Sequence, residues 1–212
     1  MFTGSVADAV GWINLAYLTI AAVAGFLADY RYFVVMTSWV HYCKYIHQYY
    51  FRGAKGNMKL YKAWQRDVLL FKSIALANLG YIYLSPFYQS WRLTGQVPSP
   101  DWVSVGMIVW GYFVSIRATQ ALGINGTYFG IELGFVTADY QFVKLWPYSM
   151  FPHPMILGQV FALTGVGMSH VGNGSWWWLV PVHVLLYLTH MTQEIYDIWT
   201  GPPWFQVVKK GN

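Results

Sequence analysis

Hydrophobic residues are gathered into long runs along this chain, and short polar clusters separate the runs. Five runs are apolar enough to span, or nearly span, a lipid bilayer, which takes about 20 residues. Their approximate limits are 12–28, 68–88, 102–122, 154–171 and 176–191. We therefore predict an all-α integral membrane protein with about five transmembrane helices, in one membrane domain that covers residues 1–212.

The segment 31–51 differs from these five runs. It is rich in aromatic residues, but it also carries His41, Lys44 and His47. Such a segment can cross the bilayer, or it can lie along the surface as an amphipathic helix. The sequence leaves both alternatives open.

Composition narrows the class of protein. Hydrophobic residues make up 56% of the chain and charged residues only 10%, against about 25% charged in ordinary soluble domains. A soluble chain of 212 residues could not enclose a core for so many apolar side chains. The 12 Trp and 17 Tyr residues are of the types enriched at membrane–water interfaces. These observations favour a membrane protein over a soluble one.

The net charge of +5 has a local origin. One short segment, opposed only by Asp67, contains Arg52, Lys55, Lys59, Lys62 and Arg66. This pattern predicts a positive-inside loop on anionic lipid, on the same side as residues 123–151 and the carboxyl-terminal tail. A single basic loop on a hydrophobic chain argues against a nucleic-acid partner. The single cysteine, Cys43, excludes an internal disulfide and thiol-rich metal sites.

A glycine-rich segment follows the third apolar run, and an elbow containing His153 and Pro154 opens the fourth. The glycines of this segment are Gly123, Gly126 and Gly130. Irregular backbone at membrane depth is tolerated only where it lines a cavity in the protein. The pattern therefore predicts a ligand site between the third and fourth runs.

Residues 109–194 resemble the active-site region of the phosphatidylethanolamine N-methyltransferases, a family of integral-membrane phospholipid methyltransferases. The matching residues are Leu122, Gly123, Gly126, Thr127, Tyr128 and Gly130, then Pro147, Pro154 and Gly158. The family transfers a methyl group from S-adenosylmethionine (SAM) to a lipid amine. The resemblance therefore implies a methyltransferase-like core at about 102–199 and a site for SAM.

Two further signatures of the family are assigned to the cofactor. Gly111 matches the second glycine of a Gly-x-Gly pair, and Val109 stands in place of the first. Glu194 matches the second acid of a Glu-Glu pair, and Gln193 stands in place of the first. A glutamine can hydrogen-bond a hydroxyl but cannot pair with an ammonium group as a carboxylate does. The resemblance assigns cofactor binding to Gly111, Gly123, Gly126, Gly130, Gln193 and Glu194.

Other residues are candidates for contact with lipid. The resemblance places His153, the candidate catalytic residue, and Pro154 next to the lipid amine. Arg117 lies inside an apolar run, where it either snorkels to the interface or binds a lipid phosphate. Three histidines, for which we predict an interfacial position and no metal site, are His170, His183 and His190.

Two functions are compatible with the sequence. The half-kept signatures favour a pseudoenzyme, a lipid-binding structural subunit of a larger membrane complex that needs no cofactor. The alternative is an active SAM-dependent N-methyltransferase of phosphatidylethanolamine-type head groups. We expect membrane phospholipids and other membrane-protein subunits as partners. The sequence leaves the mitochondrial inner membrane and the endoplasmic reticulum open as locations.

Overall fold

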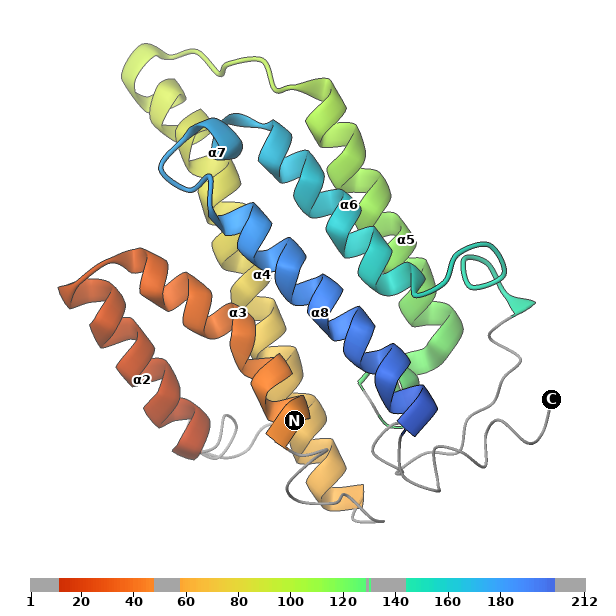
Figure 1. Cartoon of the computed structure of the whole chain (residues 1–212). Coiled ribbons are helices and arrows are strands. Elements are labelled where there is room, and N and C mark those ends of the chain that lie inside the picture. The colour runs from red at the N-terminus through yellow and green to blue at the C-terminus, as the bar shows by residue number, and fades with distance from the viewer. Residues whose placement is uncertain (1–11, 48–57, 129, 131–143, 201–212) are drawn as a thin grey trace. The chain divides into compact units, whose positions relative to one another are not determined.

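A computed structural model describes residues 12–47, 58–128, 130 and 144–200 (Figure 1). These residues form helices, turns and connections, and no strand occurs among them. Contacts within the chain divide it into two units, Met1–Tyr81 and Ile82–Asn212. The predicted all-α fold is confirmed for the described part of the chain, whereas the single-domain organisation stays a prediction.

The first unit contains α2 (Trp12–Leu27), α3 (Tyr30–His47) and the first part of α4 (Met58–Thr94). Small residues on α2 let it approach α3. Ala21 is fully buried, and a Cβ atom added to Gly25 would lie 2.9 Å from the Cβ atom of Phe33. Close packing of the two helices at small residues is therefore present at these two positions.

A network of polar side chains joins α3 to α4 within this unit. The Tyr30 hydroxyl donates a hydrogen bond of 2.5 Å to Asn78 Oδ1, and Asn78 Nδ2 donates one of 3.1 Å to Thr37 Oγ1. Asn78 and Thr37 are buried. The segment 31–51 is thus helical as far as His47, and residues 48–51 lie outside the described residues. Whether this segment crosses the bilayer stays a prediction.

The second unit contains the end of α4, then α5 (Trp102–Thr127), α6 (Pro154–Met168), α7 (His170–Asn173) and α8 (Leu179–Thr200). Helix α6 contacts both α5 and α8 and lies between them (Figure 1). The run predicted at 154–171 ends as a helix at Met168, because the extended backbone of Ser169 (φ −80°, ψ −173°) separates α6 from α7.

Two of the described helices are long and apolar enough to cross a membrane, by length and composition. They cover Tyr61–Thr94, with 34 residues, and Trp102–Thr127, with 26 residues. Shorter apolar helices cover Leu15–Leu27, Pro154–Met168 and Leu179–Thr192. Each predicted run thus corresponds to an apolar helix, but the number of about five membrane spans stays a prediction.

Helices α5 and α6 are in contact through their backbones. A Cβ atom added to Gly111 would lie 2.4 Å from the carbonyl oxygen of Gly158 and 2.6 Å from the amide nitrogen of Ala162. One added to Gly165 would lie 2.9 Å from the carbonyl oxygen of Ser104. The small residues of α6 therefore allow the close packing of α6 on α5.

Two serines of α5 bind the backbone of α6 across the same contact. Ser104 Oγ donates a hydrogen bond of 2.6 Å to the carbonyl oxygen of Gly165, and Ser115 Oγ donates one of 2.9 Å to that of Met155. Both serines are buried. Their hydroxyl groups are therefore satisfied inside an apolar helix pair, where an unpaired polar group would be costly.

Candidate functional site

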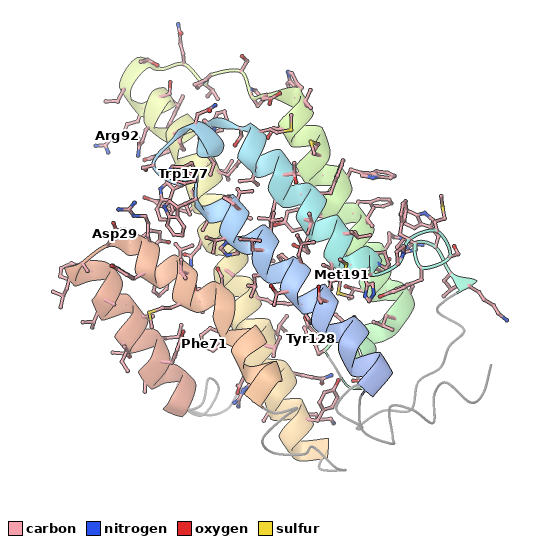
Figure 2. All side chains as sticks on the ribbon, viewed as in Figure 1. Asp29, Phe71, Arg92, Tyr128, Trp177 and Met191 are labelled. Atoms are coloured by element: carbon pink, nitrogen blue, oxygen red, sulfur yellow. The ribbon has the colours of Figure 1, made fainter. Side chains whose placement is uncertain are left out.

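The order of the helices brings most of the predicted site residues to one end of the second unit. Helix α6 runs back along α5, so the end of α5 lies at the end where α6 begins (Figure 1). Figure 2 shows Arg92 and Trp177 toward one end of this unit, and Tyr128 and Met191 toward the other. The shared end therefore holds the glycine segment, the elbow and the last turns of α8.

The first glycine of the segment breaks α5. Gly123 has φ 76° and ψ 163°, a backbone conformation that residues with a Cβ atom rarely adopt. One more helical turn follows, in which Thr127 Oγ1 donates a hydrogen bond of 2.8 Å to the carbonyl oxygen of Gly123. The amide of Gly130 donates to the carbonyl oxygen of Asn125 at 2.9 Å. The predicted interruption of the helix at this glycine is present.

Gly123 and Gly126 have different surroundings. Among the described residues, a Cβ atom on Gly123 would meet nothing within 4 Å, whereas one on Gly126 would lie 2.5 Å from Leu122 Cγ. Gly126 is buried. Burial also raises the pKa of Tyr128 above its ordinary value of 10.0. Among the described residues, no atom therefore occupies the place of a side chain at Gly123, whereas the Leu122 side chain occupies it at Gly126.

Gly111 is not part of this end of the unit. It precedes Gly123 by twelve positions, or about 18 Å along a helix, and α6 covers it. Val109, at the other position of the Gly-x-Gly signature, is 64% exposed. The structure therefore does not bring Gly111 together with the other predicted glycines.

The elbow ends at the first turn of α6. His153 precedes the helix in a left-handed conformation (φ 46°, ψ 49°), which is uncommon for a residue other than glycine. It is half-buried, and Pro154 after it is buried at the first helical position. Proline suits this position because its fixed φ matches the helix and its missing N–H would have no partner there. A left-handed residue is a mark of local constraint, which keeps His153 a candidate for function.

An open groove of about 280 Å³ lies beside the last turns of α5. Its lining residues are Arg117, Gln120, Ala121, Leu145 and Trp146. Arg117 is exposed, and its Nη1 donates a hydrogen bond of 2.7 Å to Gln120 Oε1. Of the predicted lipid-binding residues, Arg117 is thus the one that lines a described cavity.

Aromatic side chains hold the elbow against α5 next to this groove. The ring centroid of Trp146 lies 5.6 Å from that of Phe113 and 6.5 Å from that of Trp110. Sequence reasoning missed the contribution of Gln120 and Trp146. The spacing of three residues between Arg117 and Gln120 places both on one helix face and was a usable signal. No comparable signal connects Trp146 to that face.

Gln193 and Glu194 belong to α8, but their side chains lie outside the described part of the chain. Their assignment to the cofactor stays a prediction. His183 Nδ1 lies 2.8 Å from the carbonyl oxygen of Leu179 in its own helix, and the His170 ring lies 5.3 Å from that of Phe87. Among the residues described, no cluster of His, Cys, Asp or Glu is placed to hold a metal ion.

One comparison with known proteins identifies a family. Residues 101–197 match the family model described as phospholipid methyltransferase. This interval contains α5, α6, α7 and most of α8, together with the break at Gly123 and the elbow. No curated protein and no solved structure was found to match the chain. The family inferred from the glycine segment and the elbow is confirmed.

Proposed function

Residues 101–197 belong to the phospholipid methyltransferase family, and from this premise we propose that the chain binds phospholipid without transferring methyl groups. In this proposal it is a structural subunit of a larger membrane complex. The mitochondrial inner membrane and the endoplasmic reticulum are the locations that we expect. No cofactor is needed for this role.

The surroundings of the Gly-x-Gly signature are the observation that carries the proposal. Close approach of a cofactor to backbone requires a surface without side chains. The backbone of α6 covers Gly111, and Val109 presents a side chain on the exposed side of α5. Neither position offers bare backbone to SAM, which supports a loss of cofactor binding.

The second signature supports the same conclusion on chemical grounds. SAM carries an ammonium group, and a carboxylate can pair with it. Gln193 replaces the first acid of the family's pair, and an amide offers no negative charge to that group. The loss of a family residue at both cofactor signatures weakens the SAM site more than either loss alone.

The outward side of α5 supports a role among other membrane components. Trp110 is 52% exposed, and Phe113 and Ile116 are exposed as well. An exposed aromatic and apolar helix face fits lipid or a neighbouring membrane helix. In a subunit of a membrane complex, lipid and a neighbouring membrane helix would both lie against this face.

The second candidate function is an active SAM-dependent N-methyltransferase of phosphatidylethanolamine-type head groups. It is favoured by the half-buried, left-handed His153 at the end of the unit where Gly123 opens the backbone. Glu194, which keeps one acid of the family's pair, also fits an enzyme. His153 would then lie beside the lipid amine, from which a proton must leave during methyl transfer.

The deciding experiment titrates the purified full chain with labelled SAM in phosphatidylethanolamine nanodiscs and measures methyl transfer in the same samples. We expect neither saturable binding nor turnover. Restoring the family's residues with Val109→Gly and Gln193→Glu should create detectable SAM binding. Val103→Gly is the matched control, because Val103 is also exposed on α5 and the substitution removes the same side chain from the same helix.

Two other outcomes would change the conclusion. Turnover of phosphatidylethanolamine by the unmodified protein would refute the proposal, and Glu194→Ala should then weaken SAM binding by about 1–3 kcal/mol. Absence of SAM binding in the restored variant would instead contradict the assignment of residues 109 and 193 to the cofactor signatures, or would show that the α6 backbone over Gly111 blocks the site by itself.

A further inference from the structure

We propose that the groove beside Arg117 binds the phosphate of an anionic membrane phospholipid. The inference rests on the proposed lipid-binding role and assigns a place and a head-group chemistry to it. The name Arg117 groove is used below for the cavity lined by Arg117, Gln120, Ala121, Leu145 and Trp146.

The position of Arg117 along α5 favours an interfacial ligand. Helix α5 is long and apolar enough to cross a membrane, and Arg117 is exposed on it. It lies six residues before the break at Gly123, or about 9 Å along the helix. A charged group at that depth is costly unless its long side chain reaches the polar interface and a counter-charge there. Lipid phosphate is the anion present at that level of a bilayer.

The direction in which Arg117 projects separates it from the helix pair. It follows Gly111, which faces α6, by six positions, so it is turned by about 120° from that contact. Ala118 and Ser115, its neighbours on the α6 side, are buried, while Arg117 is not. The Arg117 groove therefore opens on a side of α5 that α6 does not cover.

The polar part of the groove suits a phosphodiester. Arg117 has five N–H donors, and one of its terminal nitrogens, Nη1, binds Gln120 Oε1 at 2.7 Å. That contact fixes the guanidinium on the groove wall and leaves donors for a two-point contact with phosphate oxygens. The Gln120 amide nitrogen adds two further donors. Among the described residues that line the groove, the one charged side chain is this cation.

The apolar part of the groove selects a lipid over a free anion. Leu145 and Trp146 also line the groove, and the Trp146 ring contacts Phe113 and Trp110, which lie toward the middle of α5. Phe113 is 44% exposed, so an acyl chain can lie against it. A ligand that fills the whole surface has a phosphate at one end and hydrocarbon at the other.

The test measures lipid bound to the detergent-purified full chain by native mass spectrometry. The probes are dioleoyl phosphatidylglycerol, dioleoyl phosphatidylcholine and inorganic phosphate. Arg117→Gln should weaken phosphatidylglycerol binding about tenfold or more, the range for a lost hydrogen bond to a charged group, and Arg117→Lys should weaken it less. Arg92→Gln is the matched control, because this exposed arginine ends α4 at the other end of the unit.

A second variant separates lipid from free anion. Trp146→Ala should weaken phosphatidylglycerol binding and leave any binding of inorganic phosphate unchanged. Equal binding of phosphatidylglycerol by wild type and Arg117→Gln, or an equal loss in Arg92→Gln, would overturn the proposal. Inorganic phosphate that displaces the lipid at equal concentration would overturn its lipid part.

The results that would refute the proposed function differ from those that would refute the Arg117 groove. A chain that binds phosphatidylglycerol through Arg117 and also methylates phosphatidylethanolamine would refute the structural role but support the Arg117 groove. A chain that retains no phospholipid would refute both. Unfolding curves of the Arg117 and Arg92 variants should coincide with that of wild type, because both arginines are exposed, and loss of folding would therefore be visible as such.

Discussion

Two helix contacts in this molecule are formed by different groups, one by backbone atoms and the other by polar side chains. Helices α5 and α6 touch through backbone, and at Gly111 the space of a side chain is taken by the carbonyl oxygen of Gly158. Helices α3 and α4 in the first unit are joined by hydrogen bonds between polar side chains, with Asn78 between Tyr30 and Thr37. The first contact depends on the absence of a side chain at Gly111, and the second depends on the polar side chains of Tyr30, Asn78 and Thr37.

This difference has a consequence for tolerance to change. Where backbones touch, an added methyl group must move a whole helix, because carbonyl and amide groups cannot rotate away. Where side chains meet, a removed group can be replaced in part by water or by another rotamer. The α5–α6 pair is therefore the more rigid contact, and it holds the end of the unit with the elbow in a fixed geometry.

The largest effect is expected for Gly111→Ala. The new Cβ atom would lie 2.4 Å from the carbonyl oxygen of Gly158 and 2.8 Å from the Cβ atom of Ala162, so the helices must separate. We expect a loss of about 1–3 kcal/mol, the usual cost of overpacking, measured by unfolding in mild detergent.

Gly106→Ala on the same helix is the matched control for this prediction. A Cβ atom on Gly106 would meet nothing within 4 Å, and alanine is the better helix former by about 0.8–1.0 kcal/mol. The control should therefore be neutral or more stable than wild type. Destabilisation of equal size in both variants would contradict the backbone contact.

The fold was predictable where the information is local. The apolar run predicted from residue 102 begins where α5 begins, and the run predicted from residue 154 begins where α6 begins. Both starts could be predicted because the hydrophobic pattern and the proline determine the conformation of the residues next to them. The run at 68–88 is shorter than α4, which extends from Met58 to Thr94. Its ends are polar and aromatic, so hydropathy does not detect them although the helical hydrogen bonds continue.

The sequence was sufficient to predict the glycine segment and the elbow of the site. It was not sufficient to predict which residues the fold brings into contact there. The backbone break at Gly123 follows from the glycine itself. The burial of Gly111 under α6 and the contact of Trp146 with Phe113 depend on two segments that meet only after folding. A motif position therefore indicates ancestry, while the neighbours of that position decide whether a cofactor can reach it.

A smaller effect is expected in the first unit for Asn78→Leu. The substitution removes both side-chain bonds of the network, but the Thr37 hydroxyl still donates to the carbonyl oxygen of Phe33 at 2.8 Å. Tyr30 is 37% exposed, so its hydroxyl can find another partner. We expect a loss of about 1 kcal/mol or less.

A double-mutant cycle with Tyr30→Phe tests whether this loss belongs to the network. The coupling energy between positions 30 and 78 should be about 0.5 kcal/mol or more, as for residues in one hydrogen-bond network. Additive losses would mean that Asn78 acts through packing alone. A loss above that of Gly111→Ala would reverse the comparison between the two contacts.

The smallest effect concerns Asp29, between α2 and α3. Its carboxylate accepts a hydrogen bond of 2.7 Å from Arg31 Nε and one of 2.8 Å from the Arg31 backbone amide. These side-chain and backbone bonds hold the pKa of Asp29 below its ordinary value of 3.8. The ionised form is therefore favoured by folding, so the contribution to stability is present above pH 3.8 and is lost as the pH falls through the lower pKa of the folded state. The difference in unfolding temperature between wild type and Asp29→Asn should accordingly shrink below pH 3.8. Added salt should reduce the same difference at neutral pH, because the Asp29–Arg31 ion pair is exposed to solvent and salt screens it. A difference that stays constant with pH and salt would show that the hydrogen-bonding geometry at position 29, rather than its charge, supports the turn.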